Sequence, residues 1–260
     1  MQVAGKIIGD ATSAMSDEEK NALKVLYKSL LQARRVAGEL RVFGGAHNED
    51  KEGVEKVKAA AARHAAIIET ELKEQNVTQA ASKLRDAAST APALADNPSQ
   101  RLPIIMFFYK IEAEYHSFAY EVLSEGSEMR SIAAGRARTA YDKAIEIAKE
   151  AGVSSDDVLL VCVVHSYCLF LGDVINEKQE ATKIGVSVLG LTNEMVFSGM
   201  ESDVSRIKKF LIERVDRWTA PSEGEGKEEG EDKKTKDEKN GKATPSASAA
   251  DANDSEKSEI

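Results

Sequence analysis

The chain has 260 residues and a formal net charge of −9, with 42% hydrophobic and 30% charged side chains. The negative charge argues against general nucleic-acid binding, and the longest apolar run, residues 159–171, is too short to cross a bilayer. An N-terminus without the long apolar core of a signal peptide, together with only two cysteines, favours a cytoplasmic protein, with the nucleus as an alternative.

The first predicted helix begins with a capping box at residues 16–19. The Ser16 hydroxyl is expected to accept a hydrogen bond from the Glu19 amide, while the Glu19 carboxylate reaches back to the Ser16 amide. Apolar residues then recur at three- and four-residue steps, which is typical of a helix with one buried stripe. The stripe consists of Leu23, Leu26, Leu30, Ala33, Ala37 and Leu40.

Helical periodicity continues along the chain to about residue 220, without a convincing alternating strand pattern. A polar turn is expected at 44–53 and a break at 94–103. The predicted helices cover 54–74, 76–90 (as a continuation or a restart), 104–123, 128–151, 156–175, 177–191 and 200–218. Because short connections make neighbouring helices antiparallel, we predict an all-α antiparallel bundle of about eight helices.

The composition changes after residue 220. Residues 221–260 hold 12 acidic and 7 basic side chains, a net charge of −5, and Ile260 is their only large aliphatic residue. Such a segment buries too little apolar surface to offset the entropy of ordering, so we predict a disordered acidic tail. The predicted organisation is a short N-terminal segment 1–15, a helical domain 16–220 and the tail 221–260.

Two cations of the first predicted helix, Lys28 and Arg35, stand seven residues apart. Seven residues are nearly two helical turns, with an angular drift of about 20° and a rise of roughly 10 Å. Their long side chains could therefore meet on one anion, and a phosphate suits arginine because the planar guanidinium bonds two oxygens at once. The alternative, which composition alone favours, is a solvated helix face.

Cys162, His165 and Cys168 form a Cys-x-x-His-x-x-Cys pattern within a predicted helix. A structural zinc site needs four ligands, usually from loops or helix starts, and nothing nearby supplies the fourth. Packed core residues are therefore the favoured interpretation, and we expect no metal and no cofactor. The sequence has no glycine-rich phosphate loop and no recognisable motif of a paired nucleophile and histidine, so we do not expect an enzyme.

Six segments carry the most specific pattern in the chain. They are SDEEKNALKVLYKSLLQARR at 16–35, IIETEL at 67–72, FFYKIEAEYHSFAYEV at 107–122, TAYDKAIEIAK at 139–149, YCLFLGDVIN at 167–176 and FLIERVDRWTA at 210–220. In this order they resemble the third to the last helices of the 14-3-3 proteins. The resemblance implies an all-helical, non-catalytic protein whose concave groove holds a phosphoserine or phosphothreonine peptide.

The resemblance also implies a phosphate clamp on two helices. Lys28 and Arg35 match the lysine and arginine of the family's third helix, and Lys110 matches a groove lysine on its fifth. Ser117 and Phe118, however, stand where the family has an arginine and a tyrosine. One hydrogen bond to a charged group is worth about 1.5–3 kcal/mol, so we expect a partly degraded clamp with weakened phosphate binding.

Further groove residues follow from the same resemblance. Ser166 and Arg214 stand where the family has two asparagines that hold the peptide backbone. Asp173 replaces a glutamate and is expected to orient Lys28. The apolar wall of the groove and the tryptophan near the end of the last helix correspond to Leu169, Ile207, Phe210 and Trp218.

Two functions remain open at this point. The first is a phosphopeptide-binding adaptor with a weakened clamp, whose partners are phosphorylated protein segments. The alternative is a helical scaffold that binds protein partners through the same groove without phosphate. The family dimerises largely through two helices before the third, and the 15 residues before Ser16 leave room for at most one short helix. We therefore expect homodimers or heterodimers to lack part of this contact.

Overall fold

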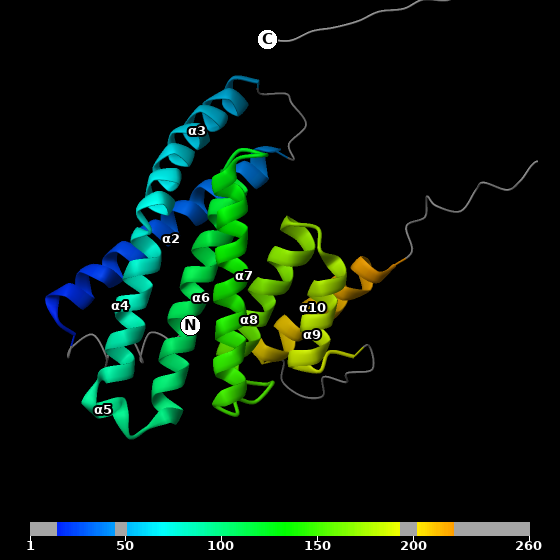
Figure 1. Ribbon diagram of the computed structural model, residues 1–260. Helices are drawn as coiled ribbons and strands as arrows, with labels where there is room; N and C mark the ends of the chain where they lie inside the picture. Colours follow the sequence, from blue (N-terminus) through cyan, green and yellow to red (C-terminus); the bar gives the residue numbers. More distant parts are fainter. Residues whose placement is uncertain (1–14, 45–50, 193–201, 221–260) are drawn as a thin grey trace, which may run out of the picture. The chain divides into compact units, whose positions relative to one another are not determined.

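The computed structural model describes residues 15–44, 51–192 and 202–220 (Figure 1). The regular elements of these residues are all helices, which confirms the predicted all-α fold, and none of them is long and apolar enough to span a membrane. In chain order they are α2 (Asp17–Gly44), α3 (Lys51–Glu74), α4 (Asn76–Thr90), α5 (Pro92–Ala95), α6 (Pro98–Val122), α7 (Glu128–Glu150), α8 (Val158–Leu169), the π-helical turn η1 (Phe170–Val174), α9 (Lys178–Leu189) and α10 (Asp203–Thr219). The predicted tail and residues 1–14 of the predicted N-terminal segment lie outside the described residues.

The start of α2 confirms the predicted capping box. The Glu19 amide donates to Ser16 Oγ at 3.2 Å, and the Ser16 amide donates to Glu19 Oε2 at 2.7 Å. Leu26, Leu30 and Ala33 of the predicted stripe are buried in the core. The position of the helix is therefore fixed by its cap at one end and by apolar packing along one face.

Several helix boundaries differ from the prediction. Gln75 has a left-handed φ of 57°, so α3 and α4 are separate helices. The predicted turn at 44–53 is too long, because α3 begins at residue 51. The predicted break at 94–103 is too long, because only residues 96 and 97 separate α5 from α6, which begins at Pro98 and includes Pro103. Proline suits the first helical turn, where its missing N–H would have no acceptor, so Pro98 starts this helix rather than interrupting it.

The predicted helix at 156–175 is divided into two elements. After α8, the Ile175 amide donates to the Phe170 carbonyl oxygen at 3.0 Å, five residues back, which is the bonding pattern of a π-helix. Gly172 lies in this turn against the indole of Trp218, and a Cβ atom added to Gly172 would lie 2.4 Å from the indole Cζ2. Glycine therefore lets α10 approach the backbone of η1 closely.

Two apolar clusters form the core, and α6 contributes to both. The first joins α2, α3 and α4 to one face of α6, which includes the fully buried Tyr115. The second joins α7, α8, η1, α9 and α10 to another face, which includes Met106 and Ala113. Helices α6 and α7 lie side by side (Figure 1), joined by a short turn. Because α6 is packed on both sides, its polar residues are held in fixed positions.

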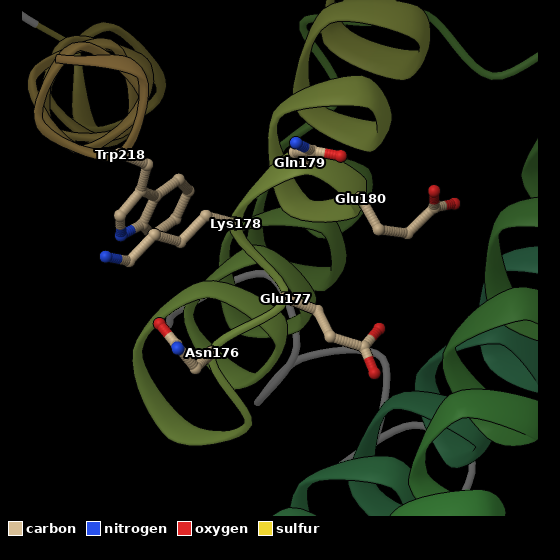
Figure 2. A pocket seen from close by; sticks show the side chains of 6 residues that line it. All are labelled: Asn176, Glu177, Lys178, Gln179, Glu180 and Trp218. Carbon is tan, nitrogen blue, oxygen red and sulfur yellow. The ribbon is translucent and has the colours of Figure 1, made fainter. Parts of the chain in front are cut away.

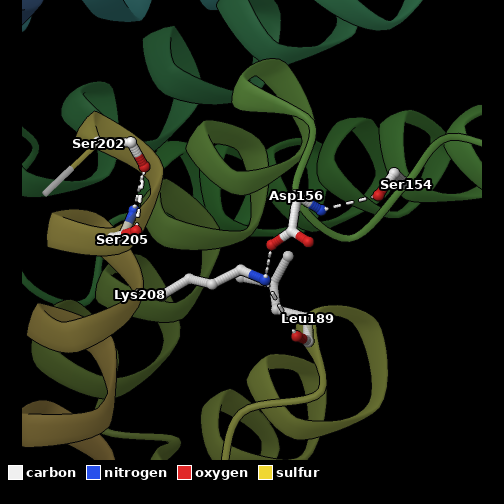
Figure 3. A network of polar contacts seen from close by, with 6 residues as sticks. All are labelled: Ser154, Asp156, Leu189, Ser202, Ser205 and Lys208. Carbon is white, nitrogen blue, oxygen red and sulfur yellow. Dashed lines mark hydrogen bonds and ion pairs between the residues drawn. The ribbon is translucent and has the colours of Figure 1, made fainter. Parts of the chain in front are cut away.

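The last described helix, α10, is held by a buried lysine as well as by apolar residues. Lys208 is only 2% exposed, and apart from Leu211 it is the only buried residue of α10. Its ammonium group donates to Asp156 Oδ1 at 2.7 Å and to the Leu189 carbonyl oxygen at 3.5 Å (Figure 3). These bonds tie α10 to the loop before α8 and to the end of α9.

Candidate functional site

Lys28 and Arg35 lie exposed on α2. Arg35 Nε is 3.7 Å from Glu39 Oε1 on the same helix, and Lys28 has no ion-pair partner within the described ranges. Neither cation contacts Lys110 or Asp173, so the structure does not bring these predicted site residues together. Both cations remain accessible to an external anion.

Lys110 lies in a polar cluster between α6 and α8. Its ammonium group is 2.5 Å from Glu114 Oε1, and the Ser166 hydroxyl of α8 donates to the same oxygen at 2.9 Å. The Lys110 side chain is 16% exposed, so its charge is neutralised largely inside the protein. Two predicted site residues, Lys110 and Ser166, thus meet through a carboxylate that was not predicted.

Ser117 is buried and faces the interior between α6 and α7. Its hydroxyl donates to the Ala113 carbonyl oxygen at 2.9 Å and lies 3.5 Å from the hydroxyl of Tyr141. Burial, with the Glu114 charge acting in the same direction, raises the pKa of Tyr141 well above its usual value. Position 117 therefore places a neutral side chain against a neutral phenol.

Asp173 binds α10 rather than α2. Its carboxylate is 2.8 Å from Arg214 Nη1 and accepts a hydrogen bond from Trp218 Nε1 at 3.0 Å. Asp173 therefore orients Arg214 and Trp218, and it makes no ion pair with Lys28. The guanidinium carbon of Arg214 also lies 5.1 Å from the ring centroid of Phe210.

The predicted apolar wall lies between α8 and α10. Leu169 and Ile207 are half-buried, and the rings of His165 and Phe210 are 5.5 Å apart. Burial, followed by the positive charge of Lys110, lowers the pKa of His165 and favours its neutral form. The imidazole therefore acts here as part of the apolar wall.

The cysteine pattern in α8 is consistent with packed residues. Cys162 and Cys168 are free thiols, and the Cys168 Sγ–H donates to the Ala181 carbonyl oxygen at 3.3 Å. Burial raises the pKa of Cys168 to about 12, so the thiol stays protonated. The part of the chain that the structure describes contains no group of three or more His, Cys, Asp or Glu side chains placed to hold a metal ion.

A pocket of about 520 Å³ opens beside Trp218 (Figure 2). Its other lining residues are polar and come from the connection between η1 and α9 and from the start of α9. They are Asn176, Glu177, Lys178, Gln179 and Glu180. Trp218 is the only predicted groove residue that lines this pocket.

The sequence prediction missed an arginine on α2. Arg41 donates two hydrogen bonds to the Glu121 carboxylate of α6, from Nε to Oε2 at 2.5 Å and from Nη2 to Oε1. On the same helix, burial and then the Glu114 charge raise the pKa of Tyr27. Tyr27, Arg34 and Arg41 stand at seven-residue steps, as Glu114 and Glu121 do on α6. The seven-residue spacing that relates Lys28 to Arg35 also relates Arg34 to Arg41, so the sequence contained the signal that could have identified Arg41.

A model of the 14-3-3 protein family matches residues 2–219. The chain belongs to the 14-3-3 family. Similar proteins include 14-3-3 protein beta/alpha-A of Xenopus laevis, 25% identical over 86% of this chain and 88% of that protein. Another is 14-3-3-like protein 1 of Caenorhabditis elegans, 25% identical over 88% of each protein. A crystal structure of a 14-3-3 protein from Cryptosporidium parvum matches with 10% identity and a TM-score of 0.47, and covers 82% of this chain and 94% of that one.

The family match extends closer to the N-terminus than expected. It begins at residue 2, whereas the similar segments quoted from the sequence begin at residue 16. 14-3-3 proteins are non-enzymatic adaptors that bind phosphorylated protein partners and dimerise. The chain is therefore an adaptor protein rather than an enzyme, and its membership of the 14-3-3 family supports a general role in phosphopeptide binding.

Proposed function

We propose that this chain is a cytoplasmic 14-3-3-type adaptor that binds phosphoserine or phosphothreonine segments of its partners through a weakened clamp. Lys28 and Arg35 provide accessible positive charge on α2, and Lys110 adds a partly buried cation on α6. The observation that carries the proposal is the burial of Ser117, whose hydroxyl is bonded inside α6. Helix α6 therefore offers a phosphate neither a guanidinium at 117 nor a phenol at 118.

The expected weakening is large. A hydrogen bond to a charged group contributes about 1.5–3 kcal/mol, and each 1.4 kcal/mol is about tenfold in affinity. The loss of one guanidinium and one phenol would therefore change a micromolar site into a roughly millimolar one. Binding remains selective for phosphate as long as the exposed cations of α2 contact it.

The test compares two fluorescent peptide pools that differ only in phosphorylation of a central serine. We expect fluorescence polarisation to show tighter binding of the phosphorylated pool. Arg35→Ala should remove most of this difference. Arg63→Ala is the matched control, because Arg63 is exposed on α3 and has no ion-pair partner within the described residues. Identical binding curves for the two pools would contradict the proposal.

A second candidate function is a scaffold that does not require phosphate. It is favoured by three cations near the predicted groove residues, each of which is paired with a carboxylate of the same chain. The pairs are Lys110 with Glu114, Arg41 with Glu121, and Arg214 with Asp173. These carboxylates neutralise positive charge that would otherwise attract a phosphate. A partner without phosphate would therefore bind at least as tightly as a phosphorylated one.

The double variant Ser117→Arg, Phe118→Tyr helps to separate the two functions. If the site has lost only part of the clamp, the variant should bind the phosphorylated pool more tightly than the parent chain does. Because Ser117 is buried, circular dichroism must first show that the variant remains folded. A folded variant without any gain would favour the phosphate-independent scaffold.

Dimer formation forms a further part of the proposal. Other 14-3-3 proteins dimerise, and we propose that this chain forms homodimers or heterodimers. The N-terminal segment was expected to be too short to supply the whole of that contact, and its residues 1–14 lie outside the described residues. Light scattering on the full chain over a range of concentrations gives the mass directly, and a monomer mass throughout would contradict homodimer formation.

A further inference from the structure

Two arginines from opposite ends of the helical domain, Arg41 of α2 and Arg214 of α10, are held in the same way. The Arg41 guanidinium carbon lies 5.9 Å from the ring centroid of Phe118, and that of Arg214 lies 5.1 Å from the ring centroid of Phe210. Each guanidinium is also bonded to a carboxylate of the same chain. Each arginine is therefore oriented by an aromatic ring and neutralised by a carboxylate. The arrangement is that of an anion-binding site in which the bound anion is a carboxylate of the same chain.

Asp173 contacts Arg214 directly and acts on Arg41 through its charge. It pairs directly with Arg214 Nη1 at 2.8 Å. The hydrogen bonds from Arg41 to Glu121 raise the pKa of Arg41, and the negative charge of Asp173 acts in the same direction. The two arginines and two carboxylates thus form one electrostatic cluster whose formal charge is zero.

The cluster retains capacity for an external ligand. The Arg41 side chain is 58% exposed and that of Arg214 is 30% exposed, so solvent reaches both. Arg214 Nε is buried without a hydrogen-bond partner among the described residues, which leaves one donor unused. A guanidinium bonds the oxygens of a phosphate in pairs, and a phosphate dianion carries twice the charge of the carboxylate that it would replace.

We propose that the phosphate of a bound partner lies between Arg41 and Arg214 and displaces the carboxylates of Glu121 and Asp173 from them. This inference rests on the proposed phosphopeptide binding and adds two residues, Arg41 and Arg214, to the proposed clamp of Lys28 and Arg35. Arg41 and Arg214 take the place of the arginine that is missing at position 117. Asp173 competes with the phosphate for Arg214. The affinity for the phosphorylated partner therefore depends on how much more strongly Arg214 binds the phosphate than the Asp173 carboxylate.

The direct test observes the arginine Nε–H resonances of the full chain by NMR during titration with the phosphorylated peptide pool. The signals of Arg41 and Arg214 are assigned from Arg41→Gln and Arg214→Gln. We expect both to shift, and the Arg214 signal to show formation of a new hydrogen bond. Separate titrations with O-phosphoserine and inorganic phosphate distinguish recognition of a peptide-borne phosphate from binding of any phosphate.

Affinity measurements provide the second readout. Arg41→Gln and Arg214→Gln should each weaken binding of the phosphorylated pool about tenfold, while Arg206→Gln, an exposed control on α10, should not. Asp173→Asn should tighten binding about threefold to tenfold, because a competing charge is removed. Glu213→Gln makes the same charge change beside Arg214 and should alter the affinity by less than about twofold.

The outcomes separate the two proposals. If the phosphorylated pool binds selectively but only the Arg35 signal shifts, the inference about Arg41 and Arg214 is wrong and the proposed function stands. Weaker binding by Asp173→Asn would overturn the role of Asp173 as a competitor. If the phosphorylated and unphosphorylated pools bind equally, the proposed function and this inference both fail.

Discussion

Helices α2 and α10 both carry cations of the proposed site, but different interactions hold them in the protein. Helix α2 is fixed by a continuous apolar face. The fully or nearly fully buried residues of that face are Ala22, Leu26, Leu30, Ala33, Val36 and Ala37. Helix α10 buries only Lys208 and Leu211. Its remaining contacts include the ion pair of Arg214 with Asp173 and the packing of Trp218 on Gly172.

The difference indicates how each side of the site responds to change. Apolar packing depends on the area removed from water and is distributed over many atoms. A buried polar bond depends on its geometry, and the loss of one partner leaves the other unsatisfied. We therefore expect α2 to lose stability only through large changes in its core, and α10 to respond to single polar changes.

The largest effect is expected from Leu26→Ala in the apolar face of α2. Leu26 is completely buried, so the variant should lose about 2–5 kcal/mol of unfolding free energy through lost burial and a cavity. Urea unfolding followed by circular dichroism measures this. Leu31→Ala is the matched control, since Leu31 is 59% exposed on the same helix and should change stability by less than about 0.5 kcal/mol. Equal losses in the two variants would show that apolar packing does not hold α2.

The next effect tests the ion pair between the buried Lys208 of α10 and Asp156. Asp156→Ala should cost about 1–3 kcal/mol, because it leaves the Lys208 ammonium group buried without its carboxylate. Lys208→Met should change stability by less than about 1 kcal/mol, because it removes the buried charge as well as the bond. Urea unfolding compares them.

The control for this pair is Lys209→Met, at the adjacent exposed position, which should have little effect. In the Lys208→Met background, Asp156→Ala should cost almost nothing more. A loss that is larger for Lys208→Met than for Asp156→Ala would mean that the lysine contributes through packing of its chain rather than through its ion pair.

Gly172→Ala should separate α10 from η1 at the indole. The added Cβ would lie 2.4 Å from Trp218 Cζ2, so the ring must move, at a cost of about 1–3 kcal/mol. Because Trp218 is the only tryptophan, its fluorescence emission reports the displacement without interference. Gly135→Ala on α7, where the added atom meets nothing within 4 Å, should instead stabilise the chain by about 0.5–1 kcal/mol. Unchanged emission from Gly172→Ala would contradict the close approach.

The smallest effect is expected for the exposed ion pair on α2. Glu39→Gln removes the partner 3.7 Å from Arg35, and exposed pairs contribute little, so stability should change by less than about 0.5 kcal/mol. Differential scanning calorimetry of the variant and the parent chain measures it. A loss above about 1 kcal/mol would show that this pair contributes more to the stability of α2 than exposed pairs usually do.

Much of the fold follows from local pattern. The capping box at Ser16 and Glu19 and the apolar stripe of α2 depend on spacing within one helix, so the sequence predicts them directly. The start of α6 was placed too late because the whole of 94–103 was interpreted as a break, although a proline such as Pro98 also favours the first helical turn. The π-helical turn was missed because one extra residue leaves the apolar pattern of residues 156–175 almost unchanged.

The partners of the charged residues were harder to predict. Asp173 was assigned to Lys28 through the resemblance to the family, but it pairs with Arg214, which stands where the family has a neutral asparagine. Such a substitution gives the carboxylate a new partner that no pattern within one helix can reveal. The seven-residue spacing of α2 could have pointed to Arg41 itself, but not to its partner Glu121, which lies 80 residues away on α6.

The π-helical turn η1 changes the direction in which the residues after α8 point, compared with an uninterrupted α-helix. It contains one residue more per turn than an α-helix, so each residue beyond it is rotated by about 100° from its α-helical position. Deletion of a single codon within 170–172 would therefore remove this rotation and turn the Asp173 side chain away from α10. One genetic event would then separate Asp173 from Arg214 and Trp218 together, without changing the chemistry of any of the three.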